Sequence, residues 1–421
     1  MSSESANVRG QSTEMREPAS NAREESTEVR EPASGVRRRE FLRSAATLSA
    51  ACLAGSVVDR TVAAAADSPS ARRPFSRQKA VGIIADARKI VTPNGIERLE
   101  AVRIGGIEQW VSIRGMDKRN PALLFLHGGP GYMSIPMSWW FTRGWEEYFT
   151  VVQWDQRGAG KTLLLNGRAA LAPTMTPERM VADAQEMVSW VGRQLGQEKI
   201  FVLGHSWGSY LGLEVAKRQP ASLHAYIGVG QLTNGPESER RGWQFALDGA
   251  RRAGNSKAVR DLQAIAPYFP PGHPSPLEDL YVQRRWLEYF GGSMAYRHGS
   301  DAESHLSELS PDYTDAEIAH IWDGNDFSEH YLLQHVLNLD ESATRQLECP
   351  LIVCAGRHDF VVNAELAAKW CEDVRAPFKR LVWFENAGHL MMTEEPGKFL
   401  VSLLEHARPL AMASGGARRP A

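Results

Sequence analysis

The stretch that decides the fold of this chain reads KIFVLGHSWG and spans residues 199–208. An apolar run leads into the pattern G-x-S-x-G, and a helix-like stretch follows from residue 210 to residue 217. Strand, G-x-S-x-G and helix in this order are typical of a nucleophile elbow, a sharp turn that lifts a serine hydroxyl clear of a sheet. Both glycines are needed because the turn is strained and leaves no room for a β-carbon. The pattern therefore predicts Ser206 as a nucleophile.

Strand and helix patterns alternate on either side of this turn. Residues 177–195 show a helical period, with Thr176 as the expected N-cap before Pro177. Further strands are expected from apolar stretches, of which the first two are continuous runs typical of strands buried on both faces: residues 122–126, 149–154, 225–229, 350–355 and 380–384. We therefore expect an α/β fold with a doubly wound, mostly parallel sheet.

The alternation breaks after residue 231. Residues 232–345 are richer in charged and aromatic side chains and are expected to be mainly helical. An insertion at this point would lie over the ends of the strands as a cap. The expected organisation is an α/β core in two parts, residues 67–231 and 346–410, with the helical cap between them and a disordered tail over residues 411–421.

A serine nucleophile requires two partners, a histidine base and a carboxylate that fixes the tautomer of the base. In a fold of this kind the chain order should be serine, acid, histidine, each after a strand. Asp359 follows the strand pattern that begins at residue 350, and His389 follows the last one. These two residues are the predicted acid and base.

Other acids and histidines fit less well. They lie inside expected helices, before a strand, or beside the predicted acid: Glu372, Asp373, Asp340, His358 and His406. His127 lies in a glycine loop and is interpreted as structural.

An oxyanion hole needs two backbone N–H groups aimed at the developing negative charge. The residue after the nucleophile, Trp207, supplies one. The loop HGGPG at residues 127–131 follows a predicted buried strand and should supply the other. Glycine lets the backbone approach a substrate closely and proline has no N–H, so Gly129 is the predicted second donor.

Composition excludes several classes of function. The chain has 421 residues and a net charge of -2, so it has no basic excess with which to neutralise the phosphates of a nucleic acid. Its four cysteines show neither metal-ligand spacing nor a disulfide framework. The segment 160–162 ends like a phosphate-binding loop, but Asp155 stands where that motif needs glycine. No metal or organic cofactor is expected.

The N-terminal residues have a composition of their own. Residues 1–36 contain the near-repeats STEMREPAS and STEVREPAS and are expected to be disordered. Residues 37–66 combine the basic segment RRREFLR, a short apolar run and four alanines, which is typical of a twin-arginine export signal. The apolar run is too short for a stable membrane anchor. We expect export to the periplasm or the medium, with the twin-arginine machinery as a partner.

Three motifs together resemble those of proline iminopeptidases: HGGPG at 127–131, DQRGAG at 155–160 and GHSWGS at 204–209. These α/β-hydrolases remove an N-terminal proline. The resemblance implies the roles already given to Ser206, Asp359 and His389, and it implies acidic cap residues that bind the substrate's free α-amino group. The nearest candidates for those acids are Glu288 and Glu329.

We therefore expect a serine hydrolase that releases N-terminal proline or small residues from short peptides through an acyl-enzyme. The alternative is a carboxylesterase or lactonase that uses the same triad on a small ester. A binding protein on a hydrolase scaffold is disfavoured, because such a protein has no need of all three catalytic groups. Dehalogenases and epoxide hydrolases need an aspartate at position 206, where this chain has serine.

Overall fold

The structure is a computed structural model that describes residues 76–413, apart from residues 274 and 300. The predicted low-complexity and signal segments, residues 1–36 and 37–66, lie outside the described residues, as does most of the predicted tail.

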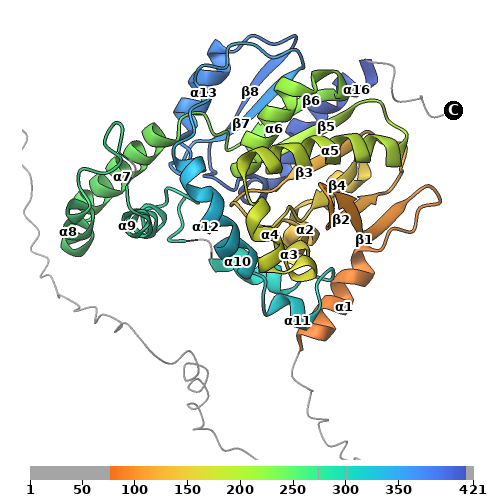
Figure 1. Cartoon of the computed structure of the whole chain (residues 1–421), viewed down its shortest axis with the longest axis horizontal. Coiled ribbons are helices and arrows are strands. Elements are labelled where there is room, and N and C mark those ends of the chain that lie inside the picture. The colour runs from red at the N-terminus through yellow and green to blue at the C-terminus, as the bar shows by residue number, and fades with distance from the viewer. Residues whose placement is uncertain (1–75, 274, 300, 414–421) are drawn as a thin grey trace, which may run out of the picture. The chain divides into compact units, whose positions relative to one another are not determined.

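An eight-stranded sheet forms the centre of the fold (Figure 1). The strand order is β1-β2-β4-β3-β5-β6-β7-β8. Strand β2 is antiparallel to both β1 and β4, and every other neighbouring pair is parallel. The strands span Ile96–Ile104 (β1), Ile107–Gly115 (β2), Ala122–Leu126 (β3), Thr150–Trp154 (β4), Ile200–His205 (β5), Leu223–Val229 (β6), Leu351–Gly356 (β7) and Lys379–Phe384 (β8). The predicted mostly parallel sheet is confirmed.

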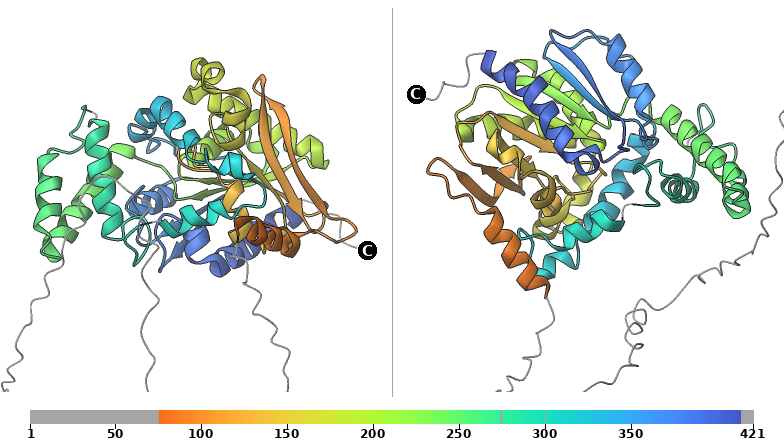
Figure 2. Two further views of the ribbon diagram at one scale, coloured as in Figure 1. Left: turned by 90° about the horizontal axis from the view of Figure 1, so that it is seen from below. Right: turned by 180° about the vertical axis from the view of Figure 1, so that it is seen from behind.

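Helices cover both faces of this sheet (Figure 2). The strands alternate their side chains between the two layers. In β3, Leu124 and Leu126 join one apolar cluster, while Leu123 and Phe125 join the other. The helices of the core span Arg77–Arg88 (α1), Ser138–Phe141 (α2), Gly160–Asn166 (α3), Arg168–Leu171 (α4), Pro177–Leu195 (α5), Trp207–Arg218 (α6), Ala364–Asp373 (α13), Met391–Glu394 (α14), Pro396–Ser402 (α15) and Arg408–Ala413 (α16). The sequence predicted α5 with its correct ends.

In the described part of the segment expected to form a cap, six helices lie between β6 and β7. They span Gly235–Arg252 (α7), Ser256–Ala264 (α8), Leu277–Tyr289 (α9), Asp301–Glu308 (α10), Asp315–Ile318 (α11) and Asp323–Leu337 (α12). Helices α7, α8 and α9 form a separate group with its own apolar centre around Leu247, Leu262 and Leu287, and α12 lies between this group and the sheet (Figure 1).

Two features at the ends of the core differ from the expected pattern. Helix α1 precedes the first strand, and no sequence pattern predicted it; its Arg88 is buried and pairs with Glu146 at 3.0 Å. At the other end, helix α16 continues to Ala413, beyond the predicted end of the core at residue 410.

Two kinds of feature are absent from the part of the chain that the structure describes. Across residues 76–413, apart from 274 and 300, no helix has both the length and the apolar character needed to cross a bilayer. The same residues contain no cluster of side chains suited to a metal ion, and their cysteines, Cys349, Cys354 and Cys371, are free and buried.

Candidate active site

The turn between β5 and α6 has the strained geometry that the G-x-S-x-G pattern predicts. Ser206 adopts φ 54° and ψ −120°, a conformation that a residue with a β-carbon rarely takes. A β-carbon at Gly208 would collide with the carbonyl oxygen of Leu126, and one at Gly204 would collide with that of Gly208. Only glycine fits at these two positions, which lets the backbone pack closely on both sides of the turn that carries Ser206.

Asp359 and His389 are brought together at the ends of β7 and β8. The His389 Nδ1–H donates to Asp359 Oδ2 at 2.8 Å. The other carboxylate oxygen accepts from the backbone N–H groups of Val361 at 2.9 Å and Val362 at 3.1 Å. Asp359 is 2% exposed and His389 is 8% exposed. These bonds fix the carboxylate and leave the Nε2 atom of His389 as the acceptor of a further proton.

The backbone of His389 is held from two sides. Its N–H donates to the carbonyl oxygen of Ser293 at 2.7 Å, and its own carbonyl oxygen lies 2.9 Å from Nε2 of His205. Burial lowers the pKa of His205 to about 3, so this imidazole is neutral, and the carbonyl partner requires its proton on Nε2. His205, the residue before the elbow serine, therefore hydrogen-bonds to the backbone of the loop that carries His389.

Gly230 lies between the predicted base, His389, and the backbone next to Ser206. It has φ +53°, and a β-carbon there would lie 2.9 Å from His389 Cε1 and 3.4 Å from Asp359 Oδ2. The preceding residue, Val229, accepts the backbone hydrogen bond of Ser206 at 3.0 Å. The imidazole edge of His389 is therefore close to the backbone that hydrogen-bonds to Ser206. The structure thus brings Ser206, Asp359 and His389 together.

The glycine loop after β3 borders the same place. A β-carbon at Gly128 would lie 3.1 Å from Ser206 Cβ, and Gly129 lines a cavity together with Ser206. Gly129 has φ +107°, a conformation in which glycine is strongly favoured. Trp207 follows the serine as the first residue of α6.

Three residues in the other motifs, His127, Asp155 and Gln156, are buried and form hydrogen bonds within and between the loops around the elbow. His127 accepts from the backbone N–H of Gln156 at 3.2 Å, and burial lowers its pKa to about 4, in agreement with its structural interpretation. The Gln156 side chain in turn accepts from Trp207 Nε1 at 3.1 Å. Asp155 accepts from the Lys161 backbone N–H at 2.9 Å and from the hydroxyl of Tyr313, and burial raises its pKa to about 7.

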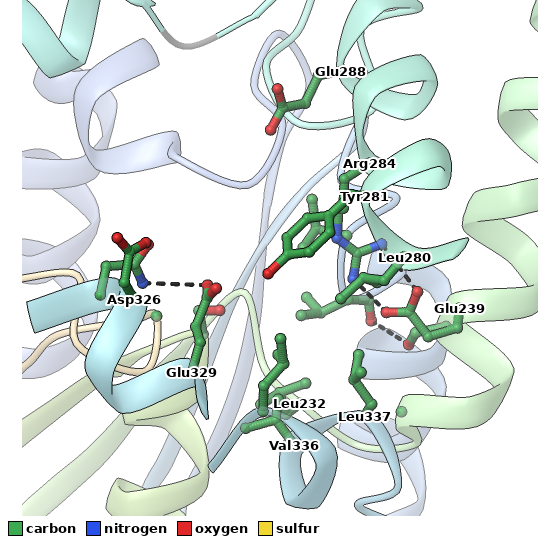
Figure 3. A pocket seen from close by; sticks show the side chains of 18 residues that line it. Leu232, Glu239, Leu280, Tyr281, Arg284, Glu288, Asp326, Glu329, Val336 and Leu337 are labelled. Carbon is green, nitrogen blue, oxygen red and sulfur yellow. Dashed lines mark hydrogen bonds and ion pairs between the residues drawn. The ribbon is translucent and has the colours of Figure 1, made fainter. Parts of the chain in front are cut away.

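The cavity that opens from Ser206 has a volume of about 530 Å³ and lies between the core and the cap (Figure 3). Its carboxylates come from three cap helices: Glu239 on α7, Glu288 on α9, and Asp326 and Glu329 on α12. Arg284 is the cation that lines it. Tyr281, Ser238 and Asn325 add further polar groups. Aliphatic side chains form most of the remaining wall: Leu232, Leu280, Leu333, Val336, Leu337, Val361 and Val362.

Glu288 and Glu329 therefore lie in one cavity with Ser206, although they were chosen from sequence as separate candidates. They come from α9 and α12, two helices on different sides of the cavity (Figure 3). Glu329 accepts from Asn325 Nδ2 at 3.2 Å, and burial raises its pKa. A cation that entered the cavity would favour the charged form of this carboxylate.

Sequence reasoning missed the ion pair in the cavity wall. Arg284 Nη1 donates to Glu239 Oε2 at 3.0 Å, and Nη2 pairs with Oε1. The Tyr268 hydroxyl donates to the same carboxylate at 2.8 Å, and Glu239 is 3% exposed. No sequence signal points to it, because Glu239 stands in the charged run 237–241 (ESERR), which is typical of a solvated helix face.

Comparisons with known proteins agree on the class of protein to which this chain is similar. Residues 121–396 match the model of a protein family whose description is "alpha/beta hydrolase fold". A probable aminopeptidase of Bacillus subtilis (strain 168) is 30% identical over 314 residues, which cover 74% of this chain and 96% of the relative. A probable proline iminopeptidase of Leptolyngbya boryana is 27% identical over 290 residues, covering 64% of this chain and 81% of the relative.

A solved structure shares the fold. The proline iminopeptidase-related protein of Thermus thermophilus has a TM-score of 0.54 at 23% identity, covering 76% of this chain and 98% of that one. With an elbow, a mostly parallel sheet and a match over most of the described residues, the chain belongs to the α/β-hydrolase family. Within that family it is proline iminopeptidase-like, as its three motifs predicted.

Proposed function

We propose that this protein is a serine aminopeptidase that removes proline or a small residue from the N-terminus of short peptides. The observation that carries the proposal is a single cavity in which Ser206, beside the hydrogen-bonded His389–Asp359 pair, lies together with the acidic excess of the cap. The aminopeptidase and proline iminopeptidase names of the relatives point to the same activity.

In the proposed reaction, Ser206 Oγ attacks the carbonyl carbon of the first residue while His389 Nε2 takes the hydroxyl proton. His389 then gives that proton to the leaving amine, and water hydrolyses the acyl-enzyme by the reverse sequence. Asp359 accepts from Nδ1–H throughout, which holds the imidazole in the required tautomer and stabilises its cationic form.

Two backbone N–H groups are proposed to bind the oxyanion. Trp207 is the first residue of α6, so its N–H has no partner within the helix, and Gly129 belongs to the loop against Ser206. Donors fixed by backbone need no reorganisation when charge develops on the substrate oxygen, which is why this arrangement accelerates acyl transfer.

Selection of a free amine is assigned to the cap. Among the described residues, four carboxylates and one guanidinium line the cavity, and that guanidinium pairs with Glu239. The remaining negative charge favours a substrate ammonium group, and Glu288 and Glu329 are the proposed partners of that group. The enclosed volume suits a short peptide better than a folded chain.

A carboxylesterase or lactonase is the second candidate, favoured by the aliphatic part of the cavity wall. A comparison of prolyl-aminomethylcoumarin, its N-acetylated form and a short-chain p-nitrophenyl ester separates the two, with purified protein lacking residues 1–66. We expect turnover of the free-amine substrate and its loss on acetylation. Cleavage of the ester alone would overturn the aminopeptidase proposal in favour of the esterase.

We further propose that residues 37–66 direct export by the twin-arginine route to the periplasm or the medium. The basis is the segment RRREFLR before a short apolar run. Replacing Arg38 and Arg39 with lysine should stop accumulation of the mature protein in the periplasm. Unchanged accumulation would exclude this route.

A further inference from the structure

The cap touches the base directly through the segment that follows α9. In this segment, residues 292–295, the Gly292 carbonyl accepts from the N–H of Phe360, the residue after the predicted acid, at 2.8 Å. The Ser293 carbonyl accepts from His389 N–H at 2.7 Å. A β-carbon at Gly388 would collide with the Ser293 carbonyl oxygen, so the two backbones are in contact.

One carboxylate, that of Glu394, hydrogen-bonds to both backbones at this contact. Glu394, the last residue of α14, accepts from the backbone N–H of Ala295 at 2.7 Å with Oε1 and from that of Gly388 at 2.8 Å with Oε2. One of these donors belongs to the cap and the other belongs to the residue before His389. Glu394 therefore bridges the cap segment and the loop of His389, in addition to the direct backbone hydrogen bond between His389 and Ser293.

The same cap segment continues from the helix that lines the cavity. Helix α9 carries Arg284 and Glu288 into the cavity and ends at Tyr289, and the Gly292 N–H bonds back to Leu287 at 2.8 Å. Helix α9 is therefore linked to His389 through two backbone hydrogen bonds, from Gly292 to Leu287 and from His389 to Ser293. The Glu394 carboxylate adds a bridge between the same two segments.

We propose that Glu394 is a positioning residue for the base, which holds the His389 loop against cap segment 292–295 and so couples the substrate cavity to proton transfer. This inference rests on the proposed function. Because a misplacement of about 1 Å can cost on the order of 100-fold in rate, loss of this bridge should lower kcat while leaving KM nearly unchanged.

The neighbouring residue provides a matched control. Glu395 accepts from the backbone N–H of Asn386 at 3.1 Å, in the same loop between β8 and α14, and none of its described contacts reaches the cap. Glu394→Gln and Glu395→Gln make the same chemical change one residue apart. In Glu394→Gln one of the two backbone donors faces an amide NH2 in place of an acceptor oxygen.

The test measures kcat, KM and the inactivation rate with a fluorophosphonate for both variants, with thermal unfolding as a check on the fold. We expect E394Q to lower kcat and the inactivation rate on the order of 10-fold to 100-fold. We expect E395Q to remain within about twofold of wild type. Equal effects of the two variants, or a change in KM alone, would overturn the proposal. If E394Q does not fold, Glu394→Asp, which keeps the charge and withdraws the carboxylate, replaces it.

A spectroscopic measurement separates this inference from the proposed function. The His389 Nδ1–H bonded to Asp359 should give a low-field proton resonance in the wild-type chain, assigned by its loss in His389→Ala. We expect the resonance to shift or broaden in E394Q and to stay in place in E395Q. An unchanged resonance in E394Q contradicts the proposal even when the peptide substrates are cleaved. A shifted resonance supports it even when they are not.

Discussion

The core and the cap form opposite halves of one cavity, but they position their groups by different means. In the core, backbone geometry does the positioning: Ser206 has a positive φ, glycines stand where a β-carbon would collide, and the proposed acid and base follow strand ends. In the cap, charged side chains on helices face one another, and Glu239 and Arg284 meet across 45 residues of sequence. The residues proposed to carry out the reaction are therefore positioned by local motifs, while those proposed to select the substrate are positioned by the packing of helices.

Asp359→Asn should have the largest effect in the core. The asparagine oxygen accepts only weakly from His389 Nδ1–H, or the asparagine NH2 donates to Nδ1 and forces the wrong tautomer of His389. We therefore expect kcat to fall about 10⁴-fold. The control is Asp373→Asn, an exposed acid at the end of α13 that the sequence offered as a weaker candidate. A loss in D373N equal to that in D359N would contradict the assignment of the acid.

Arg284→Met should have the largest effect on the stability of the cap. It leaves Glu239 buried without its cation, which costs about 3 kcal/mol of unfolding free energy. The double variant with Glu239→Gln removes the stranded charge and should recover most of that loss. Urea unfolding measures both. If R284M is as stable as wild type, the pair does not hold the cavity wall.

Glu288→Gln and Glu329→Gln test the assignment of substrate selection to the cap. Each should raise KM for a free-amine substrate about 10-fold, because a charge-assisted hydrogen bond is replaced by a neutral one. Hydrolysis of a p-nitrophenyl ester should not change. Similar losses on both substrates would mean that these residues shape the cavity and do not recognise an amine.

Asp155→Asn sharpens the comparison at the boundary between the two regions, since Asp155 in the core accepts from Tyr313 in the cap. Burial raises the pKa of Asp155 from 3.8 to about 7, so the unfolded chain loses its proton at a lower pH than the folded one. As the pH rises from 3.8 to about 7, the wild type should lose up to about 1.4 kcal/mol of unfolding free energy per pH unit relative to the variant. Above pH 7 the difference between the two proteins should stay constant. Parallel stability curves from pH 4 to 8 would contradict a buried neutral acid.

The sequence predicted the core well and the cap only in outline, for reasons visible in particular residues. Helix α5 has its Thr176 cap and Pro177 at its start, and the elbow has both glycines, so local rules were sufficient. Chain order predicted Asp359 and His389 as acid and base, and the structure places both residues after parallel strands at one edge of the sheet, where they hydrogen-bond to each other.

The cap offered no such rules. Glu239 lies in a charged run on an amphipathic helix, and nothing in the order of residues tells that Arg284 and Tyr268 cover it. The bridge by Glu394 was equally hidden, because its two partners are backbone N–H groups, one of them 99 residues away. Tertiary contacts of this kind leave no periodic pattern in the chain.

The most direct test of the account is to find where a fluorophosphonate binds covalently. Intact-mass measurement and peptide mapping of the treated protein should give one adduct, on Ser206, with none in Ser206→Ala and strongly slowed labelling in His389→Ala. No adduct on the wild-type protein, or an adduct on another residue, would contradict the claim that the elbow serine is the activated nucleophile.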